Sequence, residues 1–325
     1  MKILVTGSAG FIGAAVSNAL AKRGESVLGI DNLNDYYSPA LKKARLDLLK
    51  NAENFRFQQL DLTHSSEIRS LFVAEKFDAV VHLGAQAGVR YSLENPQIYI
   101  DSNITGTLSI LESCRHCPVR HLVYASSSSV YGDNAKIPFS VEDRTDNPVS
   151  LYAATKKSNE LMVHTYSHLF GVPATGLRFF TVYGPWGRPD MAPMLFAKSI
   201  LEGKPIRVFN HGNMRRDFTY IDDIVEGVVR TLYREQSGSE LFNIGRGEPI
   251  DLMRFIEILY DELRKGKPEI SPLQMEFLPM QQGDVPATWA DTAALEKAIG
   301  YSPKTSLEEG IKYFAQWYLE YEVKT

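Results

Sequence analysis

A tyrosine and a lysine four residues apart carry the side chains in this sequence that are best suited to proton transfer. Tyr152 and Lys156 would share one face of a helix. An ammonium beside a phenol favours the phenolate and lowers the tyrosine pKa from its usual value of about 10. Such a tyrosine can take the proton of a substrate hydroxyl while a hydride leaves the same carbon. An isolated pair with this spacing is more often an ordinary helical pair, so its function depends on neighbouring motifs.

Four consecutive serines, Ser126–Ser129, lie upstream of this pair at the end of an apolar segment. A serine at a strand end can hold a substrate hydroxyl and share its proton with Tyr152. A solvated turn would have the same composition. However, the segment between these serines and Tyr152 contains no other candidate for this role.

A glycine-rich loop near the start of the chain predicts a dinucleotide site. Gly7, Gly10 and Gly13 lie in Gly7-Ser8-Ala9-Gly10-Phe11-Ile12-Gly13, between a predicted strand and a predicted helix. Small residues let the backbone approach a pyrophosphate, and the helix N-terminus adds free N–H groups and a positive dipole end. The strand–glycine–helix context is what distinguishes this motif from an ordinary turn.

An aspartate at the end of the second predicted strand selects the cofactor. Asp31 lies 18 residues after Gly13, where a carboxylate can accept hydrogen bonds from the adenosine ribose. The same charge repels a 2′-phosphate, so we expect NAD rather than NADP. Other strand ends continue the groove, and the expected cofactor contacts also include Ala9, Phe11, Ile12, Asn32, Asp61, Leu62, Leu83, Ala85, Gln86, Asn103, Tyr152, Lys156 and Phe179.

Alternating apolar strands and amphipathic helices must position these residues, and they predict an α/β fold. We expect a Rossmann doubly wound parallel sheet with a smaller C-terminal α/β substrate-binding domain. Residues 1–180 would bind NAD, with a segment near 215–245 returning to that domain, and residues 181–325 would mainly bind the substrate. The predicted strands are Lys2–Thr6, Ser26–Asp31, Phe55–Gln59, Ala79–Leu83, His121–Ser126, Thr175–Phe180, Ile206–Phe209 and Leu241–Asn243. The predicted helices are Gly13–Arg23, His64–Glu75, Ser102–Cys114, Ser150–Leu169, Pro193–Leu201, Ile224–Arg234, Leu252–Arg264 and Thr292–Ile299.

Together, Gly7–Gly13, Ser127, Tyr152 and Lys156 resemble the extended short-chain dehydrogenase/reductases. Within that group the chain is most similar to nucleotide-sugar 4-epimerases, and in particular to UDP-glucuronate 4-epimerases. The segments that carry this narrower resemblance are Ala85–Ser92, Arg178–Met191 and Gln282–Thr288. It implies that Tyr152 removes the 4-hydroxyl proton, with Ser127 and Lys156 assisting. C4 would pass its hydride to NAD, and the 4-keto sugar would turn over before the hydride returns.

The resemblance also implies how a UDP-linked uronic acid is held. A carboxylate needs hydroxyl donors or an arginine fork, which points to Ser128, Thr181 and Arg188, and more weakly to Arg90. By resemblance Arg216 binds the diphosphate, with Gln281 and Asp284 near the ribose. Ser127, Ser129 and Val208 complete the expected substrate contacts.

Three other activities fit parts of the sequence. A UDP-glucose or UDP-N-acetylglucosamine 4-epimerase would keep the same chemistry, but a neutral sugar has no use for Thr181 and Arg188 as a carboxylate clamp. Related UDP-glucuronate decarboxylases carry acidic residues where this chain has Ser128 and Ser129. A non-enzymatic NAD sensor would typically lack the Tyr152–Lys156 pair. Gly84 stands where the family often has alanine, and we expect little consequence for the chemistry.

The amino-acid composition and net charge argue against nucleic acid and membranes as binding partners. Hydrophobic residues make up 44% and charged residues 23% of the chain, as in ordinary globular proteins. The formal net charge of −4, without a basic block, argues against nucleic acid. No apolar run is long enough for a membrane span, and we expect a cytoplasmic protein without a metal. Cys114 and Cys117 are expected to be reduced bystanders. By resemblance, the helices 102–114 and 150–169 would form a homodimer through a four-helix bundle.

Overall fold

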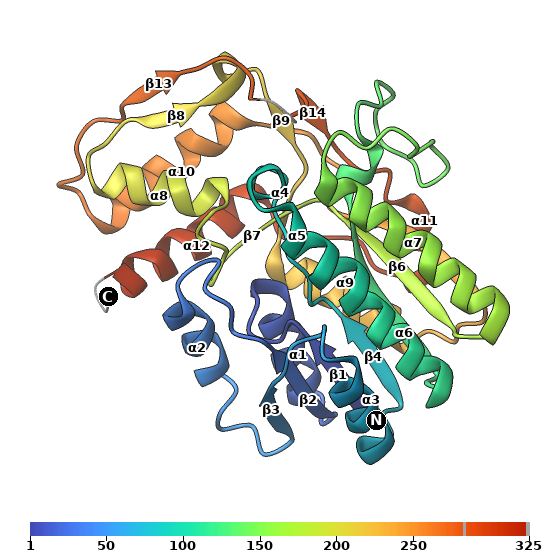
Figure 1. The fold of residues 1–325 in the computed structure, drawn as a ribbon. Coiled ribbons are helices and arrows are strands. Elements are labelled where there is room, and N and C mark those ends of the chain that lie inside the picture. Colours follow the sequence, from blue (N-terminus) through green and yellow to red (C-terminus); the bar gives the residue numbers. More distant parts are fainter. Residues whose placement is uncertain (282–283, 323–325) are drawn as a thin grey trace.

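Seven parallel strands form the central sheet of the computed structural model, which describes residues 1–281 and 284–322. Their order is β11-β6-β5-β4-β1-β2-β3 (Figure 1), so the direction of winding reverses between β1 and β4. Ligands of such sheets bind at the carboxyl ends of the strands near this reversal. The arrangement confirms the predicted doubly wound fold. The strands are β1 (Lys2–Thr6), β2 (Ser26–Asp31), β3 (Phe55–Gln59), β4 (Ala79–His82), β5 (His121–Ser127), β6 (Ala174–Phe179) and β11 (Ser239–Ile244).

Helices cover both faces of this sheet, because its strands are apolar on both sides. In β1, Ile3 and Val5 enter one hydrophobic cluster, whereas Leu4 enters the cluster on the opposite face. The first face is covered by α1 (Phe11–Lys22) and α9 (Ile221–Tyr233). The second is covered by α3 (Ser65–Glu75), α6 (Gly106–His116) and α7 (Leu151–Phe170). The helix α2 (Pro39–Asp47) and the short α4 (Tyr91–Glu94) and α5 (Pro96–Tyr99) lie in the loops after β2 and β4.

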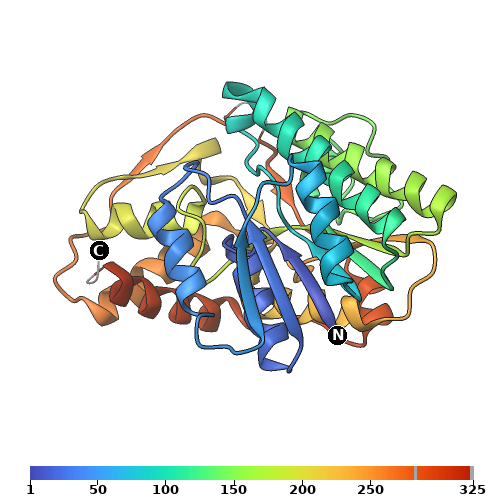
Figure 2. The same ribbon diagram turned by 60° about the horizontal axis from the view of Figure 1, so that its bottom comes forward.

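A second lobe is built from most of the chain after β6 and lies above the carboxyl ends of the strands (Figures 1 and 2). Its strand pairs are short. The strand β7 (Thr181–Tyr183) pairs with β10 (Phe218–Tyr220). The strand β8 (Ile206–Val208) pairs with β13 (Met275–Phe277). In a third small sheet, β9 (Arg215–Arg216) lies between β12 (Ile250–Asp251) and β14 (Ala287–Thr288). The helices of this lobe are α8 (Ala192–Leu201), α10 (Leu252–Gly266) and α12 (Leu307–Glu322), whereas α11 (Ala293–Ile299) packs against β11 and α9 of the sheet domain.

Every predicted element occurs in the structure, most with shifted ends, whereas α2, α4, α5 and the short strands β7, β9, β10, β12, β13 and β14 were not predicted. The helix predicted to start at Ser102 has regular α geometry only from Gly106, after a π-helical segment over Ile100–Thr105. The helix predicted from Ile224 begins at Ile221. The helix α12 had no counterpart in the prediction, although its buried side chains recur at helical spacing: Leu307, Ile311, Phe314, Ala315 and Tyr318.

Across residues 1–281 and 284–322, no helix combines the length and apolar character needed to cross a membrane. The same residues contain no group of three or more histidine, cysteine, aspartate or glutamate side chains that could hold a metal ion.

Candidate active site

A cavity of about 1020 Å³ runs along the carboxyl ends of the strands and under the second lobe. Gly7, Gly10 and Gly13 line one end, and Phe209 and Arg216 line the other. This volume is at the upper end of the range for a single small ligand. The cavity can therefore hold two ligands side by side.

The glycine loop leaves no room for side chains at the start of α1. A Cβ at Gly13 would lie 2.0 Å from the Gly7 carbonyl oxygen, and Gly7 has a φ of +70°. Gly10 precedes α1, and no side chain caps the first N–H groups of this helix. Phe11 and Ile12 line the cavity beside them. A free helix N-terminus over a loop with glycine at these three positions fits the pyrophosphate of a dinucleotide.

Asp31 is held at the end of β2 by backbone donors. Its Oδ1 accepts a hydrogen bond from Leu33 N at 2.8 Å, and its Oδ2 accepts one from Ala9 N at 3.3 Å. Burial raises the pKa of Asp31, although these hydrogen bonds and the Lys42 charge act in the opposite direction. Ala9 itself is fully buried behind the loop. The carboxylate thus faces the cavity next to the glycine loop, where a ribose would lie.

The neighbouring strand ends continue the cavity wall. Asp61 accepts hydrogen bonds from Asn32 Nδ2 at 2.8 Å and from Thr63 N at 2.9 Å, which ties the loops after β2 and β3 together. Leu62, Leu83, Ala85, Gln86 and Phe179 also line the cavity.

Asn103 lies behind this wall, because it is buried and does not line the cavity. Its side chain exchanges hydrogen bonds with Gln86 N at 2.8 Å and Gln86 O at 3.0 Å. Its Nδ2 also contacts Thr155 Oγ1 at 3.0 Å. In this structure Asn103 positions the loop after β4 rather than facing the cofactor end directly.

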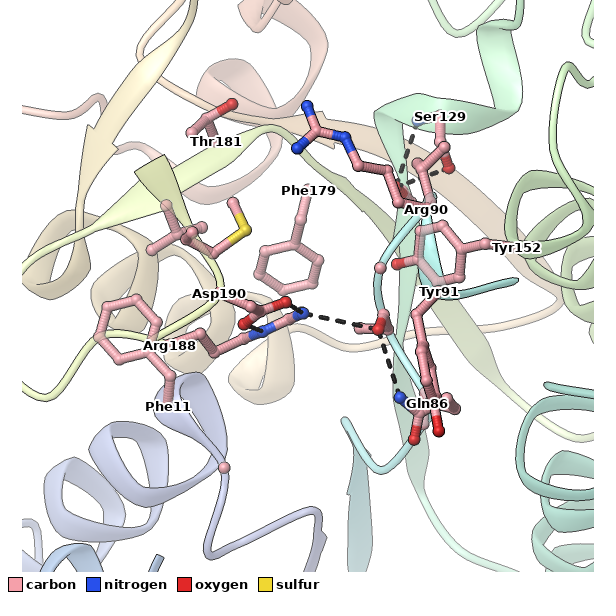
Figure 3. Close-up of a pocket in the computed structure, with 18 of the residues that line it drawn as sticks. Phe11, Gln86, Arg90, Tyr91, Ser129, Tyr152, Phe179, Thr181, Arg188 and Asp190 are labelled. Atoms are coloured by element: carbon pink, nitrogen blue, oxygen red, sulfur yellow. Dashed lines mark hydrogen bonds and ion pairs between the residues drawn. The ribbon is translucent and has the colours of Figure 1, made fainter. Parts of the chain in front are cut away.

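Ser127, Tyr152 and Lys156 meet on one wall of the cavity, and the Tyr152 hydroxyl points towards its centre (Figure 3). Ser127 ends β5, and its Oγ accepts a hydrogen bond from Ser129 Oγ at 2.9 Å. Tyr152 and Lys156 lie in the first turns of α7, whose N-terminus is capped by the Ser150 side chain. The Lys156 ammonium donates to Ala125 O at 2.9 Å.

The expected lowering of the tyrosine pKa is not found in this structure. Burial raises the pKa of Tyr152, and the Ser127 hydroxyl and the Arg188 charge only partly offset this effect. Burial also lowers the pKa of Lys156 to about 8. The prediction considered the charge of the lysine but not burial, and both groups lie where the charged form loses hydration. A bound cation or an added hydrogen-bond donor would be needed to favour the phenolate.

A buried ion pair holds the serine segment against α7. Glu160 accepts a hydrogen bond from Ser126 Oγ at 2.6 Å and pairs with Arg178 of β6, with Nε–Oε1 at 2.8 Å and Nη2–Oε2 at 2.9 Å. Both charged side chains are only 2% exposed. Arg178 also donates to Tyr131 Oη at 3.0 Å. This network fixes the distance between the ends of β5 and β6 and the helix that carries Tyr152.

The predicted carboxylate ligands line the middle of the cavity, but Arg188 already has a partner. Thr181, Ser128 and Arg188 all line the wall. The Arg188 guanidinium makes two contacts with Asp190, Nε–Oδ1 at 3.0 Å and Nη2–Oδ2 at 2.5 Å (Figure 3). Sequence reasoning treated this arginine as free.

At the far end of the cavity, two predicted ligands bind each other. Arg90 Nη2 lies 3.1 Å from Asp284 Oδ2. Arg216 lines the wall and donates to Val285 O at 2.8 Å. Gln281 also lines it, and its Oε1 is buried without a hydrogen-bond partner among the described residues. Gln282 and Gly283, part of the segment that suggested glucuronate, lie outside the described residues.

Val208 points away from the cavity, because its side chain is fully buried in the hydrophobic core. The next residue, Phe209, lines the wall instead. The guanidinium carbons of Arg90 and Arg207 lie 5.3 Å and 5.4 Å from the centre of its ring. Its aromatic face, flanked by cations, is suited to a nucleotide.

The family model described as NAD dependent epimerase/dehydratase matches residues 3–245 of the chain. The chain belongs to the NAD-dependent epimerase/dehydratase family. This family member is 48% identical to UDP-glucuronate 4-epimerase 4 of Arabidopsis thaliana over 335 residues, which covers 98% of this chain and 75% of that protein.

Solved structures of the same fold cover nearly the whole length of this family member. One is UDP-glucuronic acid 4-epimerase from Bacillus cereus in complex with UDP-glucuronic acid and NAD, at 35% identity and a TM-score of 0.91, covering 99% of this chain and 100% of that chain. Another is UDP-glucose 4-epimerase from Thermotoga maritima with UDP-glucose, at 28% identity and a TM-score of 0.85, with the same coverage.

Three residues that line or support this cavity were missed by sequence reasoning. Glu160 continues the spacing of Tyr152 and Lys156, so the same helical periodicity could have indicated it. Phe209 was assigned to a predicted strand but not to the site. Asp190 lies two residues from Arg188, and only the loop conformation reveals that they pair.

Proposed function

We propose that this chain is an NAD-dependent enzyme that interconverts UDP-glucuronate and UDP-galacturonate by inverting C4 of the sugar. The observation that carries the proposal is that one cavity contains both a Ser127–Tyr152–Lys156 wall and an arginine, Arg188. The first suits reversible oxidation of a hydroxyl, and the second suits a sugar with a carboxylate. Relatives and solved structures named for this activity, at 48% and 35% identity, support it.

The residues around the glycine loop fit NAD. We propose that residues 1–180, with the segment near 215–245 returning as α9 and β11, form the domain that binds it, through the free N-terminus of α1 and Asp31, and that 181–325 mainly bind the UDP-sugar. When bound, NAD would supply a reversible acceptor for the hydride of sugar C4 and the positive charge that Tyr152 needs in order to ionise.

The side chains of the cavity wall move and hold the proton. Tyr152 takes the proton of the sugar 4-hydroxyl, and Ser127 donates a hydrogen bond to the same oxygen. Lys156 is anchored on Ala125 O and presents its charge along the face of α7. As the 4-keto sugar forms, its ring turns within the cavity so that the opposite face meets the cofactor. Tyr152 then returns the proton to the oxygen.

The rest of the cavity wall binds the parts of the substrate that do not react. Thr181, Ser128 and Arg188 bind the sugar carboxylate. Arg216 binds the diphosphate, and the Phe209 face carries the uracil. Ser128 and Ser129 provide hydroxyls where an acid could assist loss of carbon dioxide, and Ser129 is engaged with Ser127. This favours epimerisation over decarboxylation.

We also propose that the enzyme is a cytoplasmic homodimer. Leu161 and Leu169 on α7 are 57% and 61% exposed, and Leu108 on α6 is 40% exposed. Apolar side chains gathered on two adjacent helices suit a four-helix bundle with a second copy. Cys114 and Cys117 are both free, which suits a reducing compartment.

Proton NMR of the purified protein with UDP-glucuronate, without added cofactor, tests the activity. Growth of UDP-galacturonate to a stable ratio is expected, since the cofactor is regenerated in each turnover. Absence of any product even with added NAD would refute the proposal. Conversion of UDP-glucose or UDP-N-acetylglucosamine alone would replace it with a neutral-sugar epimerase, and a UDP-pentose product would indicate a decarboxylase.

A further inference from the structure

Asp190 pairs with Arg188, the arginine that is proposed to bind the sugar carboxylate. Its two oxygens contact Nε and Nη2 of Arg188 at 3.0 Å and 2.5 Å, which is the fork geometry that arginine offers to a carboxylate. The two side chains are 30% and 20% exposed, and both line the cavity. A bound uronate would therefore compete with a carboxylate that already belongs to the protein.

The pair is locked in place from the cofactor side. Tyr36, in the loop after β2, donates a hydrogen bond from its hydroxyl to Asp190 Oδ2 at 3.0 Å. Arg188 Nη2 also approaches Ala87 O, in the loop after β4, at 3.5 Å. The pKa of Asp190 is lowered, because the Arg188 charge and these hydrogen bonds outweigh the effect of burial. Asp190 is therefore ionised, and the pair carries no net charge.

One nitrogen of the arginine remains available. Nε and Nη2 are engaged, whereas Nη1 makes no hydrogen bond to any residue in 1–281 or 284–322. A sugar carboxylate can therefore bind only one nitrogen of Arg188, Nη1, next to a charge that is already compensated. A free guanidinium would instead hold it with two parallel hydrogen bonds and a full charge.

Inversion of C4 is favoured when Arg188 binds the sugar carboxylate only weakly. The ring must present both faces to the same cofactor, so the carboxylate at C5 changes position within each turnover. A bidentate ion pair with Arg188 would stabilise one orientation of the 4-keto sugar and oppose rotation of its ring. Binding that is equally strong before and during the step does not increase its rate, and stronger binding of one orientation slows it.

We propose that Asp190, held by Tyr36, is a positioning residue that keeps Arg188 from clamping the sugar carboxylate, so that the 4-keto sugar can turn over. The inference rests on the proposed function. Its structural basis is the competition between two carboxylates for one guanidinium. Removing the protein's carboxylate should tighten binding of the uronate and slow its inversion, an opposite change in affinity and rate that simple damage to the site would not produce.

Binding and turnover of the holoenzyme test this with Asp190→Asn, which keeps the shape and removes the charge. We expect UDP-glucuronate to bind about tenfold more tightly, which corresponds to ~1.4 kcal/mol, by calorimetry in a Tyr152→Phe background that prevents turnover. UDP-glucose and UDP should bind as before, because they carry no carboxylate. With Tyr152 present, kcat should fall about tenfold while KM falls too, and reduced cofactor should accumulate during turnover.

Two further variants separate charge from shape. Tyr36→Phe removes the hydroxyl but leaves the ion pair, and it should change both constants in the same direction as Asp190→Asn but less. In the double variant Asp190→Asn, Arg188→Met, the tighter binding should disappear. Unchanged or weaker binding of UDP-glucuronate to Asp190→Asn, or an equal change for UDP-glucose, would overturn the inference. If the unmodified enzyme fails to epimerise UDP-glucuronate, the proposed function fails instead.

Discussion

Replacing Lys156 with methionine should stabilise the cofactor-free protein, although it removes a residue of the proposed reaction. Lys156 is 4% exposed, and burial lowers its pKa from 10.5 to about 8. This lowering of the pKa corresponds to roughly 3 kcal/mol of unfavourable burial of the charged form. Methionine removes that cost but leaves Ala125 O without its donor, a loss of about 1–2 kcal/mol. The free energy of unfolding at neutral pH should therefore rise by roughly 1–2 kcal/mol.

The increase in the free energy of unfolding caused by Lys156→Met should become smaller as the pH rises. Because the pKa of Lys156 is lower in the folded state, the unfolded chain binds more protons between about pH 8 and pH 10.5. The stability of the unmodified protein therefore rises with pH across this window, while that of the variant lacks this contribution. The advantage of the variant should be complete below about pH 8 and should shrink above it.

Urea denaturation of both proteins, freed of cofactor, measures this difference at neutral and alkaline pH. Lys43→Met is the matched control, because Lys43 lies exposed on α2, and its effect should stay within about 0.5 kcal/mol. A Lys156→Met protein that is less stable than the unmodified one at neutral pH would refute the reasoning. So would a difference that does not change between neutral and alkaline pH.

Three other substitutions test how the site is held together. Ser126→Ala removes the hydrogen bond to Glu160 and should lower kcat about tenfold with little change in KM, measured by steady-state kinetics. Arg45→Met removes a fully buried guanidinium that donates hydrogen bonds to Ala9 O in the glycine loop and to Gly187 O in the loop leading to Arg188. Because both loops line the cavity, the purified protein should retain less NAD and show a higher KM. Gly13→Ala places a Cβ 2.0 Å from a carbonyl oxygen of the glycine loop and should abolish NAD retention, measured by the cofactor released on denaturation. Full NAD content in the last variant, or unchanged kinetics in the first two, would contradict these roles.

The parts of the fold that follow from local patterns could be predicted from the sequence. The bounds of β1, β2 and β3 match the predicted segments, because each is a short run that ends at a turn or glycine signal. The glycine loop and Asp31 lie side by side because parallel strands bring their carboxyl ends to one edge. The same rule brings Ser127 to the cavity.

The features that could not be predicted depend on contacts between distant or irregular segments. Glu160 and Arg178 pair across a helix and a strand, and only their packing shows that both charges are buried. Arg188 pairs with Asp190 across two positions of an irregular loop, and residue spacing does not give the direction of side chains in such a loop. The raised pKa of Tyr152 follows from burial, which residue spacing does not reveal. Local patterns therefore predicted which residues line the cavity better than they predicted the state of those residues.

Conversion of UDP-glucuronate carrying deuterium at sugar C4 tests the central claim most directly. If the sugar is oxidised at C4 and reduced again within one closed cavity, the UDP-galacturonate formed should keep its deuterium at C4, and none should appear in water. The same reaction in heavy water with unlabelled substrate should place no deuterium on the ring carbons. Loss of the label from C4, or its appearance at another carbon, would show that the bond to hydrogen is broken by another route and would contradict the account.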